Sequence, residues 1–183
     1  VHAEVYLCMR VFLCRFASQH LTGFWPIILT EMVRILAQAK VDLPADKSDR
    51  LQLVFSVVKL ADFLITLQTD DFQIHQWLLI TDTPDATNPA SSYMADSLLD
   101  CLAKFVSECQ RELVFDANDS LERAQQRRPL LQMSSVATIS TLQPFFATAS
   151  RAFYQCDFHA TLDWDNINAC LLHDLFEPIH TNT

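Results

Sequence analysis

The residues with the sharpest spacing for chemistry lie near the end of the chain, where a Cys-x-x-His pair occurs twice. The first pair is Cys156 and His159, and after ten residues the second is Cys170 and His173. Zinc takes four thiolate or imidazole ligands, and ligands this close in sequence chelate it well. Cys170, however, falls on the expected apolar face of the last helix, where core cysteines are common. The sequence leaves a zinc site open but favours buried cysteines, and we expect no metal.

A second candidate site is the basic cluster of Arg123, Arg127 and Arg128 in the stretch LERAQQRRPLL. Residues 121–127 are expected to be helical, which would place Arg123 and Arg127 one turn apart on one face before Arg128-Pro129 ends the helix. Guanidinium groups bind phosphates through paired hydrogen bonds. The three arginines are therefore candidates for binding a lipid headgroup or an acidic partner segment. A solvated helix face is the alternative interpretation.

No other group of residues resembles an active site. The chain has one glycine, Gly23, so the glycine-rich phosphate loops of nucleotide-binding folds and the G-x-S-x-G motif of hydrolases cannot be built. Glu31 and Arg34, three positions apart, are expected to form an ordinary surface ion pair. We therefore expect a protein that is not an enzyme and that uses no cofactor.

Composition narrows the class of protein further. The net charge of −9 argues against general binding to nucleic acid, whose phosphates would be repelled. No apolar run approaches the roughly 20 residues that a membrane-spanning helix needs. Six cysteines lie within apolar patterns, as reduced cysteines of a cytosolic protein do. Because the chain begins at Val1, we expect residues 1–183 to be one helical domain from the C-terminal part of a larger protein.

The positioning elements predicted from apolar spacing are all helices. The stripe over Trp25–Leu36 has Pro26 in its first turn, where the missing N–H costs nothing. Residues 50–68 are apolar almost all round, which is typical of a helix covered on several sides, and their polar side chains form one narrow stripe at helical spacing: Gln52, Ser56, Lys59, Asp62 and Thr66. Further helices are expected over 92–113, 136–154 and from Asp163 or Asp165 to about Phe176. The pattern predicts an all-α fold, as an α-solenoid-like stack of HEAT- or armadillo-like helix pairs or, alternatively, a compact helical bundle.

Three stretches together resemble the C-terminal region of the Dopey family, large cytosolic proteins of Golgi and endosomal membrane traffic. They are HLTGFWPIILTEMVRIL (20–36), KLADFLITLQTDDFQIHQWLLITDT (59–83) and QRRPLLQMSSVATISTLQPFF (126–146). The resemblance runs from about residue 10 to 150, so the Cys/His segment lies largely outside it. It brings no catalytic residues and no lipid-binding motif, and the proposed role of Arg123, Arg127 and Arg128 rests on their charge alone.

The resemblance implies a scaffold or adaptor without enzymatic activity. Its expected partners are a large HEAT-repeat protein related to Arf exchange factors, an aminophospholipid flippase and kinesin. The family's C-terminal region is associated with phosphatidylinositol 4-phosphate on Golgi membranes. We therefore expect a cytoplasmic protein that is peripheral on membranes of the Golgi, trans-Golgi network and endosomes. A helical scaffold that binds only proteins remains the alternative, and a zinc-stabilised module is a third.

Overall fold

A computed structural model describes residues 2–75, 98–109, 126–155 and 160–176. Its α-helices are α1 (His2–Arg15), α2 (Trp25–Val41), α3 (Asp49–Leu67), α4 (Asp70–His75), α6 (Leu98–Cys109), α7 (Gln143–Gln155) and α8 (Trp164–Phe176). Short 3-10 turns occupy η1 (Ser18–His20), η2 (Thr22–Phe24) and η6 (Ile139–Leu142). Two two-residue strands, β1 (Gln126–Arg127) and β2 (Thr161–Leu162), pair in parallel.

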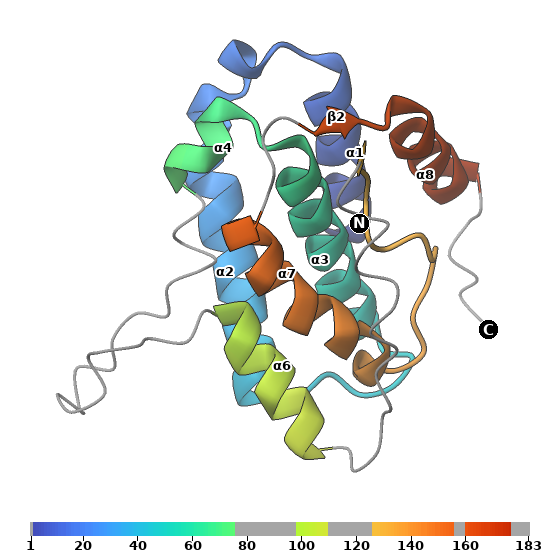
Figure 1. Ribbon diagram of the computed structural model, residues 1–183. Helices are drawn as coiled ribbons and strands as arrows, with labels where there is room; N and C mark the ends of the chain where they lie inside the picture. Colours follow the sequence, from blue (N-terminus) through green and yellow to red (C-terminus); the bar gives the residue numbers. More distant parts are fainter. Residues whose placement is uncertain (1, 76–97, 110–125, 156–159, 177–183) are drawn as a thin grey trace, which may run out of the picture.

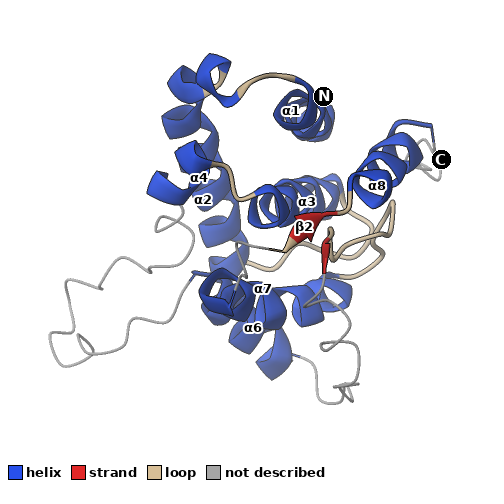
Figure 2. Cartoon of the chain, turned by 45° about the horizontal axis from the view of Figure 1, so that its top comes forward, coloured by secondary structure: helices blue, strands red, loops and turns tan. Residues whose placement is uncertain are grey.

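Helix α3 is the centre of the arrangement (Figures 1 and 2). Fifteen of its nineteen residues are buried. It contacts α1, α2 and α7, while α6 packs on α7 and α2, and α8 lies against α1. The all-α prediction is confirmed. Of the two arrangements that the sequence left open, the described helices form the compact one, with their partners gathered around α3.

The ends of α3 have recognisable local causes. The Ser48 side chain accepts a hydrogen bond from the backbone N–H of Leu51 at 3.1 Å, which satisfies one of the free donors of the first turn. At the other end Gln68 adopts a left-handed conformation, with φ of 48°, and its N–H donates to Leu64 O. Glycine usually occupies this position because it has no Cβ to clash. The helix begins and ends within one residue of the predicted range.

The polar stripe of α3 does not face solvent. Its members are buried beside other parts of the chain or bond to their own helix: the Ser56 and Thr66 hydroxyls donate to the carbonyl oxygens of Gln52 and Asp62 four residues before them. The Gln52 side chain donates to Val136 O at 3.0 Å. The prediction that this helix is covered on several sides is therefore confirmed, and even its polar side is covered.

The stripe predicted over Trp25–Leu36 is also confirmed. Trp25, Leu29, Met32 and Leu36 are almost completely buried, and they join the large apolar cluster around α3. Pro26 lies in the first turn of α2, as expected. A second, smaller cluster joins Phe63 and Leu67 of α3 to three residues of α8, namely Ile167, Cys170 and Leu171.

Candidate functional site

The arginine segment is extended where the sequence predicted a helix. Arg127 lies in β1, opposite Leu162 of β2, so the prediction that residues 121–127 form a helix through Arg127 is wrong at this end. The physical reason is a pairing between distant parts of the chain, because residues 126–127 bond to residues 161–162, and the ring of Pro129 also disfavours helical geometry for Arg128 before it. Arg123 lies outside the described residues, so its predicted position beside Arg127 on one helix face stays untested.

Arg127 and Arg128 are both half-buried, but their surroundings differ. The Arg127 Nε group donates to Ala160 O at 3.0 Å, and Arg127 O accepts from the Asp163 N–H at 3.1 Å. These bonds tie the segment to the start of α8. Within the part of the chain that the structure describes, Arg128 makes no such bond and no ion pair. Arg128 is therefore the better placed of the two to bind an external anion.

The residues after Pro129 fix the segment to α3. The Asp62 carboxylate accepts the backbone N–H of Leu130 at 3.0 Å and that of Leu131 at 2.8 Å. Burial raises the pKa of Asp62 from its ordinary 3.8 to about 6, although these two hydrogen bonds and the nearby charges of Lys59 and Arg10 lower it. A buried carboxylate of α3 thus holds the backbone directly after Pro129, close in sequence to the basic pair.

Asp62 belongs to a buried charged cluster that joins three helices, with Arg10 on α1, Lys59 and Asp62 on α3, and Asp174 on α8. The Asp174 carboxylate pairs with both Arg10 and Lys59, and all three side chains are at most 7% exposed. Arg10 also lies 5.4 Å from the centre of the Phe63 ring. The cluster has two positive and two negative groups, so it carries no net charge.

Burial lowers the pKa of Lys59, and the hydrogen bond and charge of Asp174 act in the opposite direction. Charged groups this deeply buried need such compensation, because removing one partner leaves the other charge buried with no opposite charge beside it. Apolar helix faces surround the cluster, so we interpret it as structural and not as a catalytic centre. Lys59 and Asp62 belong to the polar stripe predicted from the sequence, whereas the roles of Arg10 and Asp174 were not predicted. The feature of the sequence that could have indicated this cluster is the pair of charges three positions apart, Lys59 and Asp62, in an otherwise apolar helix.

The Cys/His segment is only partly described. Cys156 and His159 lie outside the described residues, whereas Cys170 is buried and its thiol is 3.6 Å from Asn166 Oδ1. Burial raises the pKa of the Cys170 thiol, which disfavours the thiolate that binds metal. Among the described residues, no three His, Cys, Asp or Glu side chains are grouped closely enough to hold a metal ion. The apolar position predicted for Cys170 is confirmed.

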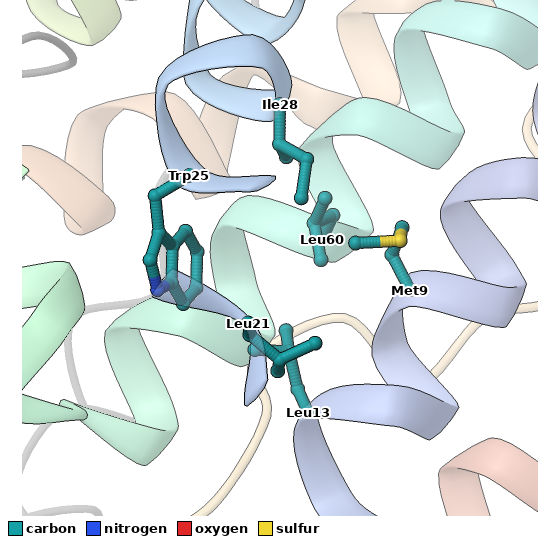
Figure 3. Close-up of a pocket in the computed structure, with 6 residues that line it drawn as sticks. All are labelled: Met9, Leu13, Leu21, Trp25, Ile28 and Leu60. Atoms are coloured by element: carbon teal, nitrogen blue, oxygen red, sulfur yellow. The ribbon is translucent and has the colours of Figure 1, made fainter. Parts of the chain in front are cut away.

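One small pocket lies between α1, α2 and α3 (Figure 3). Its volume is about 10 Å³, enough for about one water molecule. Apolar side chains line it: Met9, Leu13, Leu21, Trp25, Ile28 and Leu60. It is a packing defect beside Trp25 and too small to be a ligand site. No helix in the described ranges is both long enough and apolar enough to cross a membrane.

Comparison with known proteins identifies the family. A model of the DOP1 C-terminal family matches residues 1–159. The chain belongs to this family. The DOP1 C-terminal match includes the arginine segment and most of the buried charged cluster, but it ends before α8 and Asp174.

Two vertebrate relatives align over most of this DOP1 C-terminal chain. Protein DOP1B of Xenopus laevis is 25% identical over 82% of it, and protein DOP1B of Mus musculus is 27% identical over 84%. Protein dop1 of Emericella nidulans is 32% identical over 54% of the chain. The chain spans only about 8% of the length of the two vertebrate relatives. No solved structure matches it.

Proposed function

We propose that this DOP1 C-terminal domain is a non-enzymatic scaffold module of Golgi and endosomal membrane traffic, and that it docks on membranes containing phosphatidylinositol 4-phosphate. Its proposed protein partners are a HEAT-repeat protein related to Arf exchange factors, an aminophospholipid flippase and kinesin. Family membership supports the trafficking role. The proposed lipid contact consists of Arg127 and Arg128, together with Arg123.

One observation carries the lipid contact: two adjacent arginines sit on a segment whose backbone is fixed at both ends. Asp62 holds Leu130 and Leu131, and the strand pairing holds Arg127. A fixed segment loses little conformational freedom when an anion binds, so more of the attraction remains as affinity. A phosphate monoester offers the acceptor oxygens that a guanidinium group binds in pairs.

Flotation with liposomes tests this proposal, using vesicles with and without phosphatidylinositol 4-phosphate. The variant is Arg127→Glu/Arg128→Glu. A basic residue near an anionic surface contributes about 1 kcal/mol, so two charge reversals should reduce bound protein more than about tenfold. The matched control is Arg34→Glu/Arg50→Glu, which makes the same change in net charge on another part of the surface and should float like the parent.

A further variant, Arg128→Glu alone, separates lipid binding from folding, because Arg128 makes no bond with the described residues. Flotation that depends on the lipid and is lost in both arginine variants supports the site. Flotation that survives in them keeps the lipid function and refutes the site. If the parent chain floats with neither vesicle, the lipid proposal fails.

The second candidate is a scaffold that binds only proteins. A specific observation favours it: Val5 and Phe12 on one side of α1, and Phe16 directly after its end, are 53%, 41% and 54% exposed, and exposed Cys8 lies between Val5 and Phe12. Exposed apolar residues that gather on one helix face are typical of protein contact surfaces. An absence of lipid binding, together with loss of partner binding in Phe12→Asp, would select this candidate.

A further inference from the structure

Helix α8 covers a defined surface of the helices before it. This receiving surface consists of Arg10 and Cys14 of α1, and Lys59, Phe63 and Leu67 of α3. Figure 2 shows α8 at the edge of the arrangement, beside α1 and α3 and on the far side of α3 from α6 and α7. The receiving surface belongs to the matched family domain, whereas α8 lies beyond it.

The contacts of α8 follow one helix face. Ile167, Cys170 and Leu171, at positions i, i+3 and i+4, are buried against Phe63 and Leu67. Asp174, at i+7, lies one turn further along the same face and pairs with both cations of the receiving surface. This is the spacing with which an amphipathic helix binds an apolar surface on a partner.

The charges of the receiving surface specify what the helix must carry. Arg10 and Lys59 are 4% and 3% exposed, so they need a carboxylate beside them. Asp62 interacts with both charges at longer range, but the carboxylate that pairs directly with Arg10 and Lys59 among the described residues is that of Asp174. An acidic side chain after the apolar residues is therefore the element that the receiving surface recognises.

Helix α8 is joined to the rest of the domain by few contacts. Its apolar contacts form a cluster separate from the main core, and a two-residue strand pairing precedes it. Its other side is apolar too, with Leu172, Leu175 and Phe176 about half exposed or more. No residue of α8 belongs to the large cluster around α2, α3, α6 and α7.

We propose that the receiving surface is a docking site for an amphipathic helix of a partner protein, one that has apolar residues at i, i+3 and i+4 and an acidic residue at i+7, and that α8 occupies this site in cis. The partner's helix replaces α8 and supplies the carboxylate that Asp174 now provides. The proposal goes beyond membrane docking and does not depend on it.

The test uses the full chain and a fluorescently labelled peptide with the α8 sequence, residues 163–176, and it measures fluorescence anisotropy without lipid. In the Asp174→Lys chain, the new lysine faces Arg10 and Lys59, so α8 should leave the receiving surface free. A tethered helix competes at an effective concentration in the millimolar range, so its release should strengthen peptide binding more than about tenfold. The matched control is Asp165→Lys on the exposed side of α8, which should bind the peptide like the parent.

A peptide in which Asp174 is replaced by Lys should not bind any of the chains. Equal peptide affinity of the Asp174→Lys and Asp165→Lys chains would overturn the proposal, as would equal binding of the two peptides. If the parent forms concentration-dependent dimers by exchanging α8, the occupant of the receiving surface is a second copy of the chain. That result would also overturn the proposal.

A second measurement applies if the Asp174→Lys chain does not fold. Native-state hydrogen exchange of the parent should show α8 amides protected at least about tenfold less than those of α3, because α8 opens without unfolding the main core. If α8 and α3 exchange together, only through global unfolding, then α8 is part of the core and the docking proposal fails.

Discussion

The buried carboxylate of Asp62 predicts an unusual dependence of stability on pH. Its pKa is about 6 in the folded chain and 3.8 when it is exposed to water. The folded state therefore binds this proton more tightly than the unfolded state does. The stabilisation from this group is fully present below pH 3.8, and it is lost as the pH rises through about 6.

The magnitude follows from the two pKa values. One pKa unit corresponds to about 1.4 kcal/mol, so the full change is about 3 kcal/mol, of which about 2 kcal/mol falls between pH 4 and pH 7. The Asp62→Asn variant lacks the titrating group but keeps a side-chain oxygen that can accept one of the two backbone N–H groups. At each pH we subtract the free energy of unfolding of Asp62→Asn from that of the parent. This difference should be about 2 kcal/mol larger at pH 4 than at pH 7.

Urea denaturation followed by circular dichroism at several pH values between 4 and 7 measures this difference. Comparing the two chains at each pH cancels the titration of the acidic groups that they share. The reasoning is refuted if the difference is constant across this range, or if it favours the parent more at pH 7. In either case, burial would not control the ionisation of Asp62.

Two further predictions concern stability and use the same urea assay. Trp25→Ala should lower the free energy of unfolding by about 3 to 5 kcal/mol because the indole is almost fully buried. As a control, Arg34→Ala should lower it by less than about 0.5 kcal/mol because the ion pair of Arg34 with Glu31 is exposed. A Trp25→Ala chain that melts within a degree or two of the parent would contradict this prediction. Gln68→Gly should stabilise the chain by about 1 kcal/mol, since it relieves a left-handed residue and removes two buried side-chain atoms that have no partner. As a control, Lys47→Gly, at a left-handed but exposed position, should give only the part of this gain that comes from the backbone. If Gln68→Gly is less stable than the parent, packing of the Gln68 side chain outweighs both the relief of the backbone and the removal of the unpartnered atoms.

Local patterns predicted the helices well where they contain their own start and stop signals. Pro26 marked the first turn of α2, and Asp163 begins α8 by accepting the Asn166 N–H at 3.0 Å, as the sequence suggested. Burial of α3 followed from its nearly continuous apolar surface. Each of these features depends on residues within a few positions of one another, which is the range that periodicity reports.

The features that were missed depend on distant pairs. The strand at Arg127 exists because residues 126–127 meet residues 161–162, and a local reading of the same letters gave a helix. The role of Asp174 was not predicted because it depends on Arg10 and Lys59, which lie on other helices. A charge in an apolar helix shows that a partner is needed, but it does not show which residue provides that partner.

The pairing of Arg10 with Asp174 also has a consequence for biosynthesis, because the two residues are 164 positions apart. Closing so long a loop carries a large entropic cost, and contacts of this separation slow folding. On the ribosome, α1 and α3 are complete long before residue 174 is made. During that interval Arg10 and Lys59 lack the carboxylate that neutralises them in the folded chain. This side of α3 can reach its final form only after synthesis has passed α8, so we expect the domain to finish folding from its C-terminal end.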